Sequence, residues 1–291
     1  MNRTFLNPLA TTKLAASIAL MAKQALDHPA MLEEIPAGTE IYLPDMGSED
    51  IEVTLKAACK LESLGFSAVP HLAARRAESI ENVERRLRSL KEQAGVSKVL
   101  VIAGDQARPA GPFASSMDLL RSNLLEKHGF NDIRVAGHPE GSKDFSDKIA
   151  LEALRAKIEF CERAGAKLKI VTQFGFDADA ITRWCQWIRS EGIMLPIDLG
   201  VAGPASLTTL VKYAALCGVG ASAGFLIKRS AQISSLLKNH TSEPLVRALE
   251  NGQASGVIDN INAIHVFAFG GLRKSSEWLI ERGSWIMGRG Q

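Results

Sequence analysis

Short apolar runs alternate with amphipathic stretches along almost the whole chain of 291 residues. The apolar runs are rich in β-branched residues and too continuous for half-exposed strands, which is typical of parallel strands covered on both faces. They occupy residues 41–44, 68–72, 98–103, 133–137, 168–173, 196–201 and 263–269. An eighth run, at residues 14–21, has a composition that fits a strand or a helix equally well.

Helical periodicity fills the intervals between these runs. Many of the helical stretches follow Asp, Ser or Thr and stop at Gly, as helix capping requires. The clearest cover residues 51–64, 80–93, 147–164, 178–190 and 206–216. Since no Pro/Ser-rich linker or charge block divides the chain, the pattern predicts an α/β fold with one domain over residues 1–291, a (β/α)8 TIM barrel.

Composition narrows the class of protein without naming a ligand. The apolar fraction is 46%, the charged fraction 23% and the formal net charge +2, which favour neither nucleic acid nor an acidic membrane surface as a partner. The apolar stretch at residues 14–22 is too short to span a bilayer. Four widely spaced cysteines without a CxxC pair indicate free thiols in a reducing compartment, so we expect a cytoplasmic protein. A homo-oligomer remains open.

Polar residues stand at the carboxyl ends of several predicted strands. These residues are His71, Asp105, His138 and Gln173. In a barrel they would converge on one mouth, where ligands bind. A single histidine at a strand end is more often a structural hydrogen-bonding group than a ligand. The Gln173 amide can both donate and accept, so it suits the edge of a heterocycle such as a pterin, although it could instead cap the next helix.

Other chemistries find less support in the sequence. His71, Asp105, His138 and Glu140 are candidate metal ligands, but no HxH, HxD or HExxH motif presents two ligands from one element, so we expect no metal site. There is also no GxSxG elbow, no Walker loop and no GxGxxG fingerprint.

Five segments together resemble the methylenetetrahydrofolate reductase family in its short bacterial form. They are PHLAARR (70–76), VLVIAGDQARPAG (99–111), VAGHPEG (135–141), AGAKLKIVTQFGFD (164–177) and IHVFAFGGLR (264–273). They follow the family order from about residue 40 to the C-terminus, which leaves about residues 1–37 as a divergent N-terminal segment.

The resemblance implies a barrel that binds FAD and a reduced folate. Hydride would pass from NAD(P)H to the flavin and then to the folate methylene carbon, interconverting 5,10-methylenetetrahydrofolate and 5-methyltetrahydrofolate, with the direction left open. On the matching positions, His71, Ala103, Gly104, Asp105 and His138 would line the flavin. Asp105 would also be catalytic, because a carboxylate near the flavin ring disfavours the anionic reduced form.

The same resemblance implies a folate site. Gln173 would be a catalytic and substrate-binding residue that hydrogen-bonds the pterin. Tyr213 matches an aromatic residue that packs on folate or nicotinamide. Its ring could instead make an ordinary packing contact between a helix and the barrel. Arg273 would meet a folate carboxylate.

Four positions depart from the family pattern. Ala19 stands where the family carries a glutamate that acts as general acid, and a methyl group cannot transfer a proton. Ala103 replaces an arginine, His138 a tyrosine and Ser142 a histidine. Losing cationic contacts should weaken binding of the FAD pyrophosphate, unless Arg75, Arg76 or Lys143 compensates.

These departures leave two further functions open. One is a non-catalytic or partner-dependent homologue that still binds folate or flavin. The other is a barrel enzyme that acts on an unrelated small molecule.

Overall fold

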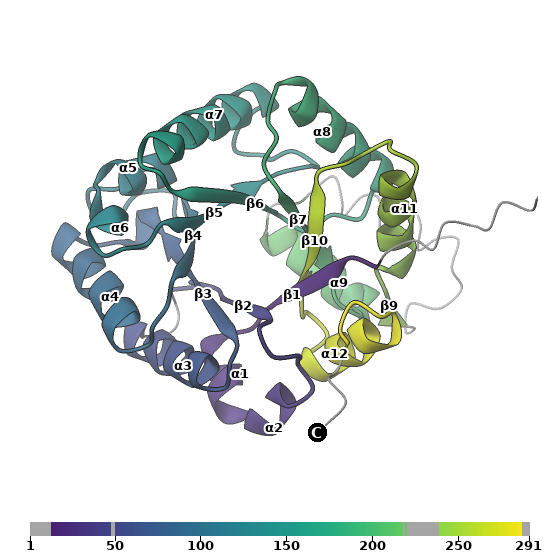
Figure 1. The fold of residues 1–291 in the computed structure, drawn as a ribbon, viewed down its shortest axis with the longest axis horizontal. Helices are drawn as coiled ribbons and strands as arrows, with labels where there is room; N and C mark the ends of the chain where they lie inside the picture. The colour runs from purple at the N-terminus through teal and green to yellow at the C-terminus, as the bar shows by residue number, and fades with distance from the viewer. Residues whose placement is uncertain (1–12, 48–49, 218, 220–238, 287–291) are drawn as a thin grey trace, which may run out of the picture.

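Eight parallel strands form a closed barrel in the computed structural model, which describes residues 13–47, 50–217, 219 and 239–286 (Figure 1). The strands are neighbours in the order β1-β10-β7-β6-β5-β4-β3-β2. Their bounds are β1 Ala15–Ala19, β2 Glu40–Leu43, β3 Ser67–Ala73, β4 Lys98–Ile102, β5 Asp132–Gly137, β6 Lys167–Thr172, β7 Ile197–Ala202 and β10 Ile261–Phe267. The predicted TIM barrel is therefore confirmed. The ambiguous run at residues 14–21 is a strand, which pairs with β10 and β2 and closes the barrel.

Helices surround the barrel as an outer ring (Figure 1). Several begin at a Ser or Asp whose side chain accepts a backbone N–H, as at Ser79, Ser146 and Asp177. The helices are α1 Ala22–Asp27, α2 Pro29–Leu32, α3 Ile51–Ser63, η1 Ala74–Arg76, α4 Ile80–Glu92, α5 Ser116–Arg121, α6 Leu124–Lys127, α7 Asp147–Arg163, α8 Ala178–Ser190, α9 Leu207–Leu216, α11 Glu243–Ala254 and α12 Leu272–Glu281.

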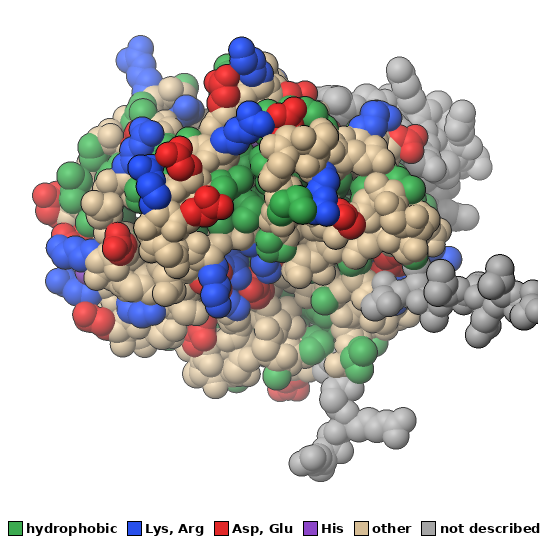
Figure 2. Space-filling model, turned by 45° about the horizontal axis from the view of Figure 1, so that its top comes forward, with side chains coloured by type: hydrophobic (Ala, Val, Ile, Leu, Met, Phe, Trp, Pro, Cys, Tyr) green, Lys and Arg blue, Asp and Glu red, His purple; other side chains and the backbone are tan. Residues whose placement is uncertain are grey.

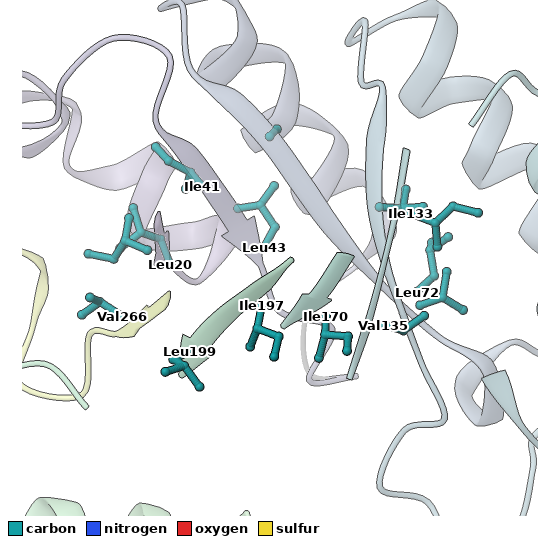
Figure 3. Close-up of a cluster of buried hydrophobic side chains, with 14 of the residues drawn as sticks. Leu20, Ile41, Leu43, Leu72, Ile133, Val135, Ile170, Ile197, Leu199 and Val266 are labelled. Atoms are coloured by element: carbon teal, nitrogen blue, oxygen red, sulfur yellow. The ribbon is translucent and has the colours of Figure 1, made fainter. Parts of the chain in front are cut away.

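The main hydrophobic core lies between the barrel and its helices. Successive strand residues point to opposite faces, so every second side chain, such as Ile41, Ile170 and Leu199, faces the helices. Figure 3 shows such residues from several neighbouring strands in one cluster. This packing explains why the strands read as apolar runs in the sequence.

Charged side chains from the strand starts fill the amino half of the barrel interior. A Glu40 carboxylate oxygen lies 2.7 Å from Arg134 Nη2 and 3.0 Å from Lys98 Nζ. Lys169 Nζ lies 3.0 Å from Asp198 Oδ2. The Tyr42 hydroxyl donates to Glu40 over 3.1 Å and connects this ionic layer to the apolar layer above it.

Helix α9 lies behind the strands in Figure 1, within the outline of the ring of helices and not as a part of it. Leu210 and Ala214 of α9 pack on Phe174 and Phe176, which follow β6. A small antiparallel sheet of β8 (Ala205–Ser206) and β9 (Asn239–His240) accompanies this region. The carboxyl side of β6, β7 and β10 is therefore covered by a helix that a regular TIM barrel would place outside.

On the face drawn in Figure 2, basic and acidic side chains are interspersed. Along the described stretches, no helix combines the length and apolar character needed to cross a membrane.

Candidate active site

The carboxyl end of β3 presents His71 next to β4, where it pairs in register with Leu100. Burial lowers the pKa of His71 to about 4; the positive charge of Arg86 acts in the same direction, and Asp45 opposes it. The imidazole is therefore neutral at physiological pH. Its Nε2 is buried and has no hydrogen-bond partner among the described residues.

The loop after β4 carries Ala103, Gly104 and Asp105. The Ala103 carbonyl accepts the Arg75 N–H over 2.8 Å, which ties this loop to η1. Gly104 has a φ of +90°, and a side chain there would approach Ala73 Cβ to 3.3 Å, so this position needs glycine. Asp105 is exposed and lies 2.5 Å from Arg76 Nη2.

Arg75 is bound to the backbone of the same loop. Its Nε donates to the Ala114 carbonyl over 2.8 Å and its Nη1 to the Gln106 carbonyl over 3.2 Å. The two arginines considered as replacements for missing cationic contacts therefore both already have partners, Arg75 in backbone carbonyls and Arg76 in Asp105. Ser142 and Lys143 lie in the loop between β5 and α7.

The next two strands bring His138 and Gln173 together. The Gln173 N–H donates to the Gly137 carbonyl over 2.8 Å, so the two strand ends lie side by side. The Gln173 side-chain oxygen accepts the Phe174 N–H over 3.1 Å, and the amide therefore lies at the strand exit. His138 makes an edge-on contact with Phe145, and its pKa is lowered to about 4 by burial and by Lys157.

Glu140 fastens these two loops to each other. Its Oε1 accepts the N–H of Phe176 over 2.6 Å and that of Asp177 over 2.9 Å. Burial raises the pKa of Glu140, although both hydrogen bonds oppose the rise. A Cβ at Gly175 would lie 2.5 Å from the same oxygen, so only glycine permits this clamp.

An aromatic cluster forms the opposite side of the mouth. Tyr213 of α9 stacks on Phe269 with a centroid distance of 4.2 Å and an interplanar angle of 15°. Phe269 also contacts Phe267 and Phe174, at 5.6 and 4.9 Å. Tyr213, Phe267 and Phe269 are partly exposed, whereas Phe174 is buried. We call Tyr213, Phe267 and Phe269 the aromatic wall.

Ala19 ends β1 in the apolar interior layer with Val171 and Ile102. Two residues earlier on the same strand, the Ser17 hydroxyl lies 2.9 Å from His265 Nδ1. Burial is the largest cause of the low pKa of His265, which is about 3, and the nearby His71 lowers this pKa further. The position where the family's acid is expected is therefore an alanine above a neutral imidazole.

Arg273 lies near the start of α12, is exposed, and has its Nε 3.1 Å from Glu277 on the same helix. The structure does not bring it together with the other predicted residues through any contact of the described chain. Within the described ranges, no group of three His, Cys, Asp or Glu side chains is arranged to hold a metal ion.

Comparison with known proteins identifies the family. The family model for methylenetetrahydrofolate reductase matches residues 31–261. The chain belongs to the methylenetetrahydrofolate reductase family. β1 with Ala19, and α12 with Arg273, lie outside the matched range.

Individual members of the family match over shorter segments. The 5,10-methylenetetrahydrofolate reductase of Pectobacterium carotovorum is 29% identical over 163 residues, which cover 54% of this chain and 51% of that protein. Methylenetetrahydrofolate reductase 2 of Saccharomyces cerevisiae is 32% identical over 118 residues, 37% of this chain and 19% of that protein. The matches thus span about half or less of these relatives.

A solved structure shares the fold over nearly its whole length. It is a Clostridium thermocellum protein described as binding two copies of 5-methyl-5,6,7,8-tetrahydrofolic acid. The TM-score is 0.64 at 12% identity, with 96% of this chain and 98% of that chain covered.

Besides Tyr213, which was predicted, two features of the mouth of this family member were not predicted from its sequence: the role of Glu140 and the presence of Phe267 and Phe269 beside Tyr213. Glu140 was considered only as a metal ligand, whereas the structure makes it a loop clamp; its spacing from Gly175 gave no signal. The aromatic wall had a visible signal, since Phe267 and Phe269 alternate along the end of the last strand.

Proposed function

We propose that this protein is a folate-dependent oxidoreductase that interconverts 5,10-methylenetetrahydrofolate and 5-methyltetrahydrofolate by hydride transfer, with FAD as the carrier and NAD(P)H as an electron donor. The observation that carries the proposal is the position of Gln173 at the carboxyl end of β6 in a barrel of this family, near Phe174 and the aromatic wall.

The two sides of the mouth suit a pterin. Gln173 offers a donor and an acceptor for the ring edge, once its oxygen exchanges the Phe174 N–H for the ligand. The partly exposed rings of Phe267 and Phe269 offer flat apolar surface for stacking. The pterin would thus be oriented by one amide and held by aromatic contact.

The β3–β5 side of the mouth fits a flavin. The orphaned Nε2 of His71 is a buried group that needs a partner, and the neutral His71 and His138 add no charge beside a flavin ring. Gly104 allows close approach of a ligand to the backbone. Lys157 of α7, whose pKa burial lowers, has no ion-pair partner among the described residues and is available to an anionic group. When bound, FAD supplies a ring that can accept and return a hydride.

An absorption spectrum of the purified protein with and without FAD tests this assignment. We expect a bound flavin that bleaches when 5-methyltetrahydrofolate is added without oxygen. Gln173→Ala should retain the flavin spectrum while weakening folate binding by about tenfold or more, because a buried pterin edge loses its partner. Gln93→Ala, the same substitution at an exposed position at the end of α4, is the matched control.

A second function is favoured by Ala19 and Ala103, which lack the family's acidic and cationic groups. It is a folate- or flavin-binding homologue without hydride transfer. A flavin that binds but is not bleached by folate, while folate still binds by calorimetry, would identify it. If no flavin binds at micromolar concentrations, the FAD assignment is wrong.

A further inference from the structure

The carboxyl end of β6 contains one residue more than the stretch of β7 beside it. The last regular pair between the two strands is Val171 with Asp198. The next pair is the isolated bridge of Gly175 with Val201. Three residues, with Gln173 in the middle, therefore stand opposite two residues of β7, which is the count of a β-bulge. A bulge beside a functional site changes the direction of a side chain.

The side chain of Thr172 bridges the two strands at this bulge. Its hydroxyl oxygen accepts the N–H of Gly200 on β7 over 2.8 Å and donates to the Gln173 carbonyl over 2.9 Å. Thr172 is only 2% exposed, so both bonds are buried. A Cβ at Gly200 would lie 2.4 Å from the Thr172 carbonyl oxygen, so this close approach of the strands needs glycine. A side-chain hydroxyl thus accepts the bond that a backbone carbonyl accepts in a regular ladder.

The same contacts fix the backbone of Gln173. Its N–H donates to the Gly137 carbonyl of β5 over 2.8 Å, and its carbonyl accepts the Thr172 hydroxyl. The side chain itself is half-buried, and its oxygen accepts the Phe174 N–H. Successive residues of a strand point to opposite faces, so the local backbone conformation decides whether the Gln173 amide faces the mouth.

We propose that Thr172 is a positioning residue, whose hydroxyl holds the bulge and thereby directs the Gln173 amide toward the pterin. This role rests on the proposed function, in which Gln173 binds the pterin edge. Valine has nearly the shape of threonine but leaves the Gly200 N–H and the Gln173 carbonyl without this partner in a buried place. The bulge then relaxes toward a regular ladder, which turns the Gln173 side chain away from the mouth.

Titration calorimetry of the full chain with 5-methyltetrahydrofolate tests the proposal. Thr172→Val should bind about fivefold or more weakly than wild type, whereas Thr172→Ser, which keeps the hydroxyl, should stay within about twofold. The double variant Thr172→Val/Gln173→Ala should bind no more weakly than Gln173→Ala, because Thr172 acts through Gln173. Thr39→Val is the matched control. It also removes a hydroxyl that donates to a backbone carbonyl, that of Pro36 over 2.6 Å, but before the start of β2, and it should leave binding unchanged.

Three results would overturn the positioning role: unchanged binding in Thr172→Val, an equal loss in Thr172→Ser, or a double variant in which the two losses multiply. Multiplied losses would mean that Thr172 supports the mouth as a whole and not Gln173. A loss in Gln173→Ala without one in Thr172→Val refutes the positioning role alone. If Gln173→Ala binds as tightly as wild type, the proposed folate contact is wrong, and this role falls with it. Thermal unfolding of each variant confirms that it is folded at the temperature of the titration.

Discussion

Replacing Glu40 with Gln removes the carboxylate that Arg134, Lys98 and Lys169 share inside the barrel. The side chain is 16% exposed, and its oxygens lie 2.7, 3.0 and 3.8 Å from the three cationic nitrogens. Burial alone would raise the pKa of Glu40, but the positive charges of Arg134, Lys169 and Lys98 outweigh burial and lower it from 4.5 to about 2.

That pKa difference corresponds to about 3 kcal/mol of folding free energy, at about 1.4 kcal/mol for each pH unit. Because the folded-state pKa is depressed, this stabilisation is fully present above pH 4.5 and is lost as the pH falls toward 2. Glu40→Gln also leaves the partly buried Lys98 beside a neutral amide and the buried Arg134 with Asp132 as its remaining carboxylate partner. We therefore expect the variant to lose about 3–5 kcal/mol at pH 7, as for other buried ion pairs that lose one partner.

Urea unfolding followed by tryptophan fluorescence at pH 7, 5 and 3 measures this loss. The gap between wild type and Glu40→Gln should narrow at pH 3, because Glu40 is by then mostly protonated in the unfolded chain while it is still mostly ionised in the folded chain, so unfolding is favoured by proton uptake. Glu159→Gln is the control, since Glu159 is 71% exposed and pairs with the equally exposed Arg163 one turn away, and it should cost less than about 0.5 kcal/mol. A loss below about 1 kcal/mol, or a gap that is the same at pH 7 and pH 3, would refute the argument.

Three smaller changes test other parts of the site. Gly175→Ala should cost about 1–3 kcal/mol in calorimetric unfolding, because its Cβ would collide with Glu140 Oε1, and an unchanged melting temperature would contradict the clamp. The NMR signals of the His265 ring should not titrate above pH 5, since its pKa is lowered to about 3. The contribution of the neutral ring to the free energy of unfolding is complete above pH 6.5 and is lost as the pH falls toward 3. A midpoint near 6.5 would show an exposed ring. Tyr213→Ala should lose about 2 kcal/mol with the Phe269 stack, whereas Tyr213→Phe should lose little; equal losses would assign the effect to the hydroxyl.

The strands were predictable because their outward side chains pack on helices. Ile41, Ile170 and Leu199 belong to that shell, and they produce the apolar runs. The ionic interior was not predictable from the same pattern. Glu40 stands just before a predicted run, where a charged residue usually indicates a loop, and only barrel closure brings it to Arg134 on a strand 94 residues away.

The position of α9 shows a second limit. The sequence predicted a helix at residues 206–216, and the structure has Leu207–Leu216. Helical periodicity tells which face is apolar, but not which surface covers that face. Packing of Leu210 on Phe174 and Phe176 beyond β6, and not on the outer wall of the barrel, is decided by tertiary contacts.

The strand ends located candidate residues, but not the partners of their side chains. His71 on β3 and Gln173 after β6 do stand at the same end of the barrel, with β4 and β5 between them, since the strands are parallel and the barrel is closed. Asp105 instead pairs with Arg76, and Arg273 with Glu277, because a charged side chain takes a partner among several nearby groups. Their predicted roles toward cofactor and folate stay predictions.

The end of β1 allows the proposed reaction to be tested at the position of the missing acid. Ala19 is 9% exposed among Val171 and Ile102, and the pair of Ser17 and His265 below it offers a neutral ring. A carboxyl group introduced by Ala19→Glu would lose water there, so its pKa should rise and keep part of it protonated near neutral pH, as a general acid requires. We expect Ala19→Glu to turn over methylenetetrahydrofolate about 100-fold faster than Ala19→Gln, with a rate that falls as pH rises through that pKa.

Ala19→Gln is the matched control, because it adds similar volume without a transferable proton. Both variants should lose about 1–3 kcal/mol of stability, since the new side chain enters a packed apolar layer. Equal rates in the two variants from pH 5 to 8, with both still folded, would show that the proton does not need to come from this position. Water or another group at the mouth would then supply the proton. A second outcome is that 5-methyltetrahydrofolate bleaches the flavin although Ala19→Glu turns over no faster than Ala19→Gln. The barrel would then retain hydride transfer, and the protonation step would not depend on a carboxyl group at residue 19.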